Sequence, residues 1–149
     1  MRTLHPGDVA VAQRGERLAT LLGSCVAIVL TDPRRTVGAM CHVVSTGHTS
    51  GERRHSTAFG EAAMLHMQAS LRAQGIEPRL CEAFAYGGGN MFGPRGEVIG
   101  VGMKNAHWAL DALDSLGVHL LAHDLGGVGY RKLAWTVGPG VPEVTTVAV

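Results

Sequence analysis

Two apolar runs on either side of a tight turn restrict the fold of this chain more than any other feature. Residues 26–31 read Val-Ala-Ile-Val-Leu-Thr and are rich in the β-branched side chains that favour a strand. The turn Asp32-Pro33-Arg34-Arg35 follows, in which Pro33 fixes φ as a β-turn requires. Residues 36–44 form the second run. The sequence therefore predicts a β-hairpin over residues 26–44.

The register of this hairpin brings two reactive side chains together. If the turn occupies residues 32–35, Thr31 faces Thr36, and counting back along both strands pairs Cys25 with His42. Direct cross-strand partners project from the same face with Cβ atoms about 4.5 to 5.5 Å apart. The sequence therefore predicts a contact between the Cys25 thiol and the His42 imidazole.

A thiol beside a histidine can act as a nucleophile. An imidazolium stabilises the thiolate and so lowers the pKa of the cysteine. Thr20, Ser24 or a backbone carbonyl could accept the second ring N–H. Gly23 and Ser24 leave room for backbone N–H groups that stabilise an oxyanion. The ordinary alternative is an inert, buried Cys25 and a hydrogen-bonded core histidine, and composition alone favours that alternative.

The remaining segments alternate between strand and helix patterns. Strands are predicted over residues 18–22, 80–86, 97–101, 118–122 and 132–137, one helix from a cap at Ser56 or Thr57 to a stop at Gly75, and a second helix from Lys104 to Leu116. Glycine-rich loops are expected at residues 87–90 and 124–130, and a mobile tail from Gly138. Strands that come first and then alternate with helices predict an α+β domain with mixed sheets.

Length and composition indicate one domain that spans residues 1–149. The chain is 46% hydrophobic and 17% charged, which gives ample apolar surface for a single core. Its formal net charge of +1 lacks the positive field that binding to nucleic acid or anionic lipid needs. We therefore expect no nucleic-acid partner.

The apolar runs and the cysteines indicate the compartment. The longest apolar stretch near the N-terminus, residues 9–12, is shorter than a signal-peptide core, and no run is long enough to cross a bilayer. Cys25, Cys41 and Cys81 are odd in number and have no CxxC spacing, so free thiols in a reducing compartment are expected. These features predict a cytoplasmic protein without membrane insertion.

Two further patterns were weighed for ligand binding. His119 and His123 have i, i+4 spacing and Cys41 adjoins His42, but neighbouring strand residues point to opposite faces, and no HExxH or paired CxxC completes a ligand set. Residues 87–93 are glycine-rich but lack the Gly-Lys-Ser/Thr ending of a P-loop. We expect neither a metal nor a nucleotide.

Five ordered motifs add a family resemblance. They are Thr20-Leu21-Leu22-Gly23-Ser24-Cys25-Val26 followed by Gly38-Ala39-Met40-Cys41-His42, then Phe59-Gly60-Glu61-Ala62-Ala63-Met64, then Tyr86-Gly87-Gly88-Gly89-Asn90-Met91-Phe92, then Gly102 with Asn105, and finally Asp124-Leu125-Gly126-Gly127 with Arg131-Lys132. In this order they resemble the CheD family of chemoreceptor glutamine deamidases. The resemblance extends from about Val9 to Trp135.

This resemblance implies a fold and a set of roles. The fold is a three-layer sandwich of two mixed β-sheets and a helical layer. Cys25 is implied as the nucleophile, His42 as the general base and Thr20 as the residue that orients the histidine. The backbone around Gly23 and Ser24 would form the oxyanion site, with the loop Gly88-Gly89-Asn90 as oxyanion site or site wall.

The resemblance also implies partners. The substrate would be a methyl-accepting chemotaxis receptor, with glutamines deamidated through a thioester, and no cofactor is needed. Some family members also hydrolyse receptor methyl esters, and some bind a CheC-type phosphatase. Tyr130 departs from the family pattern, which has glycine there, and the loop from Gly47 to His55 has no assigned role. The alternative is a non-enzymatic chemotaxis adaptor that keeps this fold only to dock on receptors or on the phosphatase.

Overall fold

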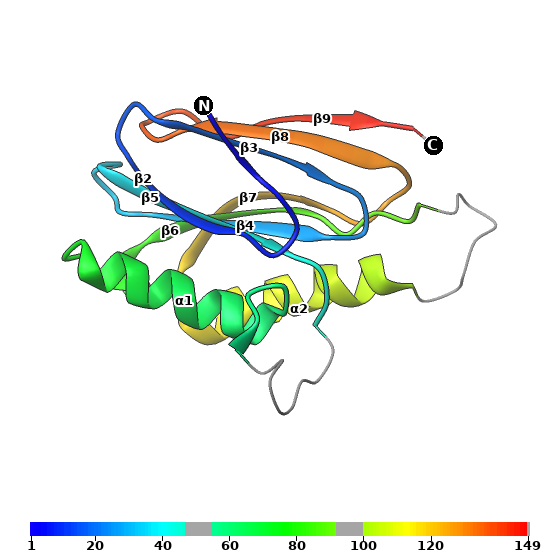
Figure 1. The fold of residues 1–149 in the computed structure, drawn as a ribbon, viewed down its shortest axis with the longest axis horizontal. Coiled ribbons are helices and arrows are strands. Elements are labelled where there is room, and N and C mark those ends of the chain that lie inside the picture. Colours follow the sequence, from blue (N-terminus) through cyan, green and yellow to red (C-terminus); the bar gives the residue numbers. More distant parts are fainter. Residues whose placement is uncertain (47–54, 92–99, 149) are drawn as a thin grey trace.

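The computed structural model describes residues 1–46, 55–91 and 100–148 and forms three layers (Figure 1). Its elements are β1 (Arg2–Leu4), β2 (Val9–Gln13), β3 (Arg17–Leu22), β4 (Val26–Thr31), β5 (Val37–Val43), α1 (Gly60–Ala73), the short 3-10 helix η2 (Pro78–Leu80), β6 (Glu82–Gly87), α2 (Val101–Leu116), β7 (His119–Leu125), β8 (Tyr130–Thr136) and β9 (Glu143–Val147). Five strands form one sheet, in the order β2-β5-β4-β6-β7, and four form the other, in the order β1-β3-β8-β9.

The five-stranded sheet is the middle layer, with both helices on one face and the four-stranded sheet on the other (Figure 1). Each sheet is mixed, because β1 runs parallel to β3 and β6 runs parallel to β7 while the other pairs are antiparallel. The predicted α+β sandwich of two mixed sheets and a helical layer is confirmed.

Burial on both faces explains why the middle strands are apolar without interruption. Every residue of β4 and β5 is buried. Alternate side chains of β4 enter two different cores, since Ile28 packs with Met67 of α1 on the helix side, and Val29 packs with Trp135 of β8 on the side of the second sheet. The parity of a residue on these strands therefore decides which core it faces.

The predicted hairpin is confirmed, but its predicted register is wrong. Thr31 pairs with Gly38 and not with Thr36, so His42 lies opposite Ala27 and not opposite Cys25. The reason is the side chain of Asp32, whose carboxylate accepts hydrogen bonds from Thr36 N at 2.8 Å and from Val37 N at 2.9 Å. These bonds lengthen the turn by two residues. Because the register shifts by an even number of residues, Cys25 and His42 still lie on the same face of the sheet, as predicted.

The two ends of the chain form strands that the sequence pattern did not indicate. β1 and β2 precede the first predicted strand, and β9 follows the segment that was predicted to open a mobile tail. That prediction is wrong, because Glu143–Val147 pairs with β8 from Ala134 to Tyr130 and Glu143 forms an ion pair with Arg17 at 3.2 Å. The short β-branched stretch is held by its neighbours and not by a strong pattern of its own.

The helices differ from prediction at their starts. The N-cap of α1 is Phe59 and not Ser56 or Thr57, because the Thr57 hydroxyl donates to the Gly7 carbonyl at 2.6 Å. The C-terminal stop is confirmed, with Gly75 in the left-handed region.

The segments around the second helix also differ. Helix α2 begins at Val101, three residues before the predicted Lys104. The strand predicted over 97–101 lies outside the described residues at 97–99 and is wrong at Val101. The strand predicted over 80–86 begins later, at Glu82, because Leu80 belongs to the 3-10 helix η2.

Candidate active site

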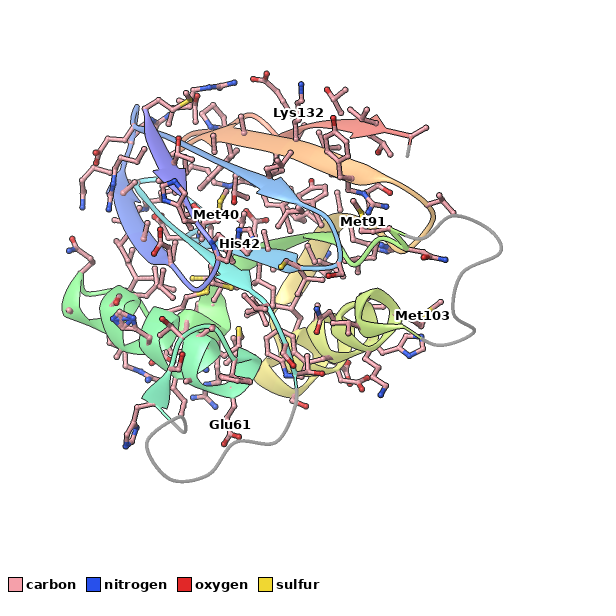
Figure 2. The ribbon with its side chains drawn as sticks, turned by 45° about the vertical axis from the view of Figure 1, so that its right-hand side comes forward. Met40, His42, Glu61, Met91, Met103 and Lys132 are labelled. Carbon is pink, nitrogen blue, oxygen red and sulfur yellow. The ribbon has the colours of Figure 1, made fainter. Side chains whose placement is uncertain are left out.

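His42 lies on β5 in the core between the two sheets. It is 2% exposed, and it shares its strand face with Met40, which packs in that core. Figure 2 shows both labelled side chains within the sheet layers, far from Glu61 at the outer end of α1. The site therefore belongs to the sandwich between the sheets and not to the helical layer.

A hydrogen-bond chain fixes the tautomer of His42. The Thr20 hydroxyl donates to the Leu4 carbonyl at 2.8 Å and contacts His42 Nδ1 at 2.7 Å. A hydroxyl has a single proton, and here that proton is given to the carbonyl, so the contact with the ring requires a proton on Nδ1. His42 Nε2 is then an acceptor, and it has no hydrogen-bond partner among the described residues. Nε2 is therefore available to accept a proton as a general base.

The charge state of the ring follows from its surroundings. Burial lowers the pKa of His42 because the imidazolium loses hydration, Asp8 raises the pKa by attraction and His5 lowers it by repulsion. Both residues come from the β1–β2 turn, whose Gly7 N donates to the His42 carbonyl at 2.9 Å. Burial dominates, so the imidazole is neutral at neutral pH and can accept a proton.

Cys25 lies in the short connection between β3 and β4. It is partly buried and packs against the same core that holds Ala27. Because it precedes Ala27 by two residues, it is the diagonal neighbour of His42 on the same side of the sheet. No hydrogen bond joins its sulfur to the ring among the described residues. Cys25 and His42 therefore lie on the same side of the sheet, as predicted, but as diagonal neighbours and not as direct cross-strand partners.

The pKa of Cys25 shifts away from the thiolate that a charged histidine nearby could stabilise. Burial raises the pKa of Cys25, because the half-buried sulfur loses hydration. Together with the neutral imidazole, this makes the resting pair a thiol and a base. Proton transfer has to accompany attack by the sulfur.

The glycine loop after β6 supports the backbone on either side of Cys25. Gly88 N donates to the Cys25 carbonyl at 2.8 Å and Gly89 N donates to the Gly23 carbonyl at 2.9 Å. Gly87 has φ 113°, and a Cβ there would lie 2.2 Å from the Cys25 carbonyl oxygen, so only glycine fits. The loop is thus a wall built against the cysteine turn.

These bonds narrow the candidates for an oxyanion site. The amides of Gly88, Gly89 and Asn90 all donate to backbone carbonyls, that of Asn90 to Gly127 at 2.8 Å. In contrast, the amides of Gly23, Ser24 and Cys25 have no acceptor within the described parts of the chain. Of the residues expected at the oxyanion, Gly23 and Ser24 keep free amide donors, whereas the amides of Gly88, Gly89 and Asn90 are used by the backbone.

Two buried polar residues at the site were not assigned a role from the sequence. Arg131 of β8 is 4% exposed and donates to the carbonyls of Gly87 at 3.0 Å and Gly126 at 2.7 Å, which ties β8 to the ends of β6 and β7. Asn105 of α2 donates to the carbonyls of Ser24 at 2.8 Å and Val44 at 3.0 Å. Each belongs to one of the five motifs that resemble the CheD family, and this resemblance was the only sequence feature that could have indicated a role for it.

A cavity of about 300 Å³ opens beside the cysteine turn. Its surface is mainly apolar, and the residues that line it are Ser24, Gly88, Gly89, Asn90, Met91, Gly100, Val101, Gly102, Met103, Gly126 and Gly127. Figure 2 shows Met91 beside the strand ends and Met103 on the first turn of α2. The cavity reaches the predicted site-wall residues and Ser24, the neighbour of Cys25 in the chain.

The other two thiols differ from Cys25. Cys41 faces the helix-side core and Cys81 is buried just before β6, and burial raises their pKa to about 12 and about 11. We expect limiting iodoacetamide near neutral pH to alkylate Cys25 first, with inactivation in step. Peptide mapping by mass spectrometry checks this, with His42→Ala expected to slow the reaction. Earlier modification of Cys41 or Cys81, together with loss of activity, would assign the nucleophile elsewhere.

Within residues 1–46, 55–91 and 100–148, no group of three or more His, Cys, Asp or Glu side chains could hold a metal ion. A register shift in β7 places His119 opposite Glu82 and His123 opposite Ala85, on opposite faces of the sheet. In the same described ranges, no helix is both long and apolar enough to cross a bilayer.

Comparison with known proteins places the chain in a family. A family model described as CheD chemotactic sensory transduction matches residues 44–146. The probable chemoreceptor glutamine deamidase CheD 2 of Albidiferax ferrireducens is 33% identical over 92% of this chain and 82% of its own length. The probable chemoreceptor glutamine deamidase CheD of Pseudomonas syringae pv. syringae is 36% identical over 92% of this chain and 79% of its own length. The chain belongs to the CheD family.

The CheD relatives cover the candidate site as well as the family-model region. The family model begins after His42, but only 8% of the 149 residues, about 12, stay outside the alignment with the Albidiferax protein, so that alignment spans Thr20, Cys25 and His42. The Tyr130 departure from the CheD pattern lies at the start of β8, opposite Val147 of β9. The loop from Gly47 to His55 lies outside the described residues up to residue 54.

Proposed function

We propose that this protein is a protein-glutamine amidohydrolase that deamidates specific glutamines of methyl-accepting chemotaxis receptors. The relatives carry the name chemoreceptor glutamine deamidase, which supports the substrate class. The single observation that supports the chemistry is the buried His42, whose Nε2 has no hydrogen-bond partner among the described residues and which lies on the same side of the sheet as Cys25. Both sheets draw strands from both ends of the chain, so the proposal treats residues 1–149 as one deamidase domain.

The proposed first half-reaction forms a thioester. His42 Nε2 takes the Cys25 proton as the sulfur attacks the side-chain amide carbon of a glutamine. The negative oxygen of the tetrahedral intermediate accepts hydrogen bonds from the free amide N–H groups of Ser24 and Cys25. The imidazolium then gives its proton to the departing nitrogen, and ammonia leaves.

The second half-reaction releases glutamate. Water gives a proton to His42 Nε2 while its oxygen attacks the thioester carbon, and the carbon–sulfur bond breaks. The thiolate recovers the proton, so Cys25 and His42 return to their starting states. No step uses a cofactor. The experiment is to incubate the protein with receptor fragments and to map mass gains of about 1 Da at glutamines, alongside ammonia release.

Thr20 is proposed to orient His42, and its replacement tests that role. Thr20→Val keeps the shape but removes the acceptor for Nδ1–H, so the tautomer with a basic Nε2 is no longer favoured. We expect kcat to fall roughly tenfold, less than for loss of the base itself. Thr20→Ser keeps the hydroxyl and is the matched control. Full activity in Thr20→Val would remove Thr20 from the site.

A CheC-type phosphatase is proposed as a regulator rather than a substrate. This extends the family resemblance and is tested by adding the purified phosphatase to the deamidation assay. A protein that binds receptor fragments but never releases ammonia, with Cys25 intact, would instead support the adaptor alternative.

A further inference from the structure

Asn105 joins the two segments that carry the reactive pair. It lies on the first turns of α2 and is 0% exposed. One nitrogen, Nδ2, donates to the carbonyl of Ser24, which precedes Cys25, and to the carbonyl of Val44, which follows His42 by two residues. A single side-chain amide thus bridges the cysteine turn and the histidine strand.

The strand pairing itself does not extend to this point. The ladder between β4 and β5 ends at the pair Val26–Val43, one residue short of both Cys25 and Val44. The Cys25 carbonyl is held by Gly88, which belongs to the loop after β6 and not to β5. Within the described residues, the hydrogen bonds that tie the cysteine turn to the end of β5 are therefore those of Asn105.

These two bonds use the nitrogen of the Asn105 amide and leave its oxygen unpaired within the described chain. Both neighbouring groups are carbonyls, which fixes Nδ2 toward them. The Oδ1 atom is then buried without a hydrogen-bond partner among the described residues. A buried, unpaired acceptor is unfavourable for folding, and such groups in native proteins call for an explanation other than stability.

We propose that Asn105 is a positioning residue, which sets the spacing between Cys25 and His42 by bridging Ser24 and Val44. This inference rests on the proposed function. Asn105 does not touch the substrate, because its side chain is fully buried beneath the turn. Its loss should therefore act on the approach of the thiol to the base and not on substrate affinity.

The test compares Asn105→Ala with Leu113→Ala, a buried residue near the other end of the same helix. Leu113→Ala also lowers stability but leaves the bridge intact, so it controls for weakened packing of α2. All measurements are made well below the unfolding midpoint of each variant. For Asn105→Ala we expect kcat, and the rate of Cys25 alkylation by iodoacetamide, to fall about 10- to 100-fold with KM unchanged. Leu113→Ala should change neither rate by more than about twofold.

A double variant separates positioning from a general structural effect. If Asn105 acts through the pair, removing it from His42→Ala should slow alkylation of Cys25 by less than about twofold, since the base is already lost. Equal losses in both backgrounds would overturn the inference, as would unchanged rates in Asn105→Ala. Asn105→Ser, whose hydroxyl is too short to span both carbonyls, serves if the alanine variant does not fold.

The outcomes also distinguish this inference from the function on which it rests. If His42→Ala does not slow alkylation of Cys25, the proposed Cys–His mechanism fails. If His42→Ala slows it and Asn105→Ala does not, only the positioning role fails. Loss of the folded state in both Asn105 variants would also overturn it, because the bridge would then hold the fold and not the site.

Discussion

Replacing Cys25 by alanine is expected to leave a folded protein with no detectable deamidation. The thioester cannot form without the sulfur, and loss of a nucleophile costs about a factor of 10⁴ to 10⁶ in kcat. The fold should survive, because the bonds that hold the turn use the backbone carbonyls of Gly23, Ser24 and Cys25 and not the thiol. Ammonia release and the mass gain of about 1 Da in receptor fragments measure the loss.

The matched control is Cys81→Ala, which removes a buried thiol away from the cavity. It should lower the unfolding temperature and leave kcat unchanged, because Cys81 packs in the helix-side core. Unchanged ammonia release in Cys25→Ala would end the catalytic assignment. Equal losses in the two variants would show that stability, and not chemistry, had been measured.

Replacing His42 by alanine should lower kcat by about 10² to 10⁴-fold, the contribution of a general base and acid. The structure also predicts the direction in which activity depends on pH. Burial lowers the pKa of His42, and the active form carries the neutral ring, so activity should be lost only as pH falls through a value below the ordinary histidine range. The pH profile of kcat/KM of the unaltered protein measures that acid limb.

Asp8 provides the check on this assignment. Its charge raises the pKa of His42, so Asp8→Asn should lower that pKa further and move the acid limb to lower pH. The asparagine oxygen can still accept the bond from His5 N, which keeps the turn in place. His119→Ala, at an exposed position on β7, should leave the profile unchanged. An acid limb that persists unaltered in His42→Ala would assign the titration to another group.

Local sequence pattern predicted the strands of the hairpin that carries the site, but not their register. Residues 26–31 and 37–43 are apolar because β4 and β5 are buried on both faces, so their strand character could be inferred from composition. The register could not, since it depends on hydrogen bonds from Thr36 and Val37 to the Asp32 carboxylate. An even shift preserved the side on which Cys25 and His42 lie, and an odd shift would have separated them.

The role of the N-terminal strand and the charge states of Cys25 and His42 could not be inferred from local sequence. β1 is three residues long, yet its Leu4 carbonyl accepts the Thr20 hydroxyl bond that fixes the tautomer of His42. Nothing local in that segment indicates such a role. A nearby histidine can favour a thiolate, but here burial raises the pKa of Cys25 and lowers that of His42. Burial depends on the assembled layers and not on neighbours in sequence.

The sequence by itself determined the fold class, the family and the identity of the two reactive residues that we propose, because strand-forming runs and ordered motifs are local properties. Only the tertiary structure decided the diagonal arrangement of Cys25 and His42, the free Nε2, and the bridging positions of Asn105 and Arg131. These features join residues from β1, β3, β5, α2 and β8. Their distances are set by packing of separate layers, which no stretch of sequence encodes alone.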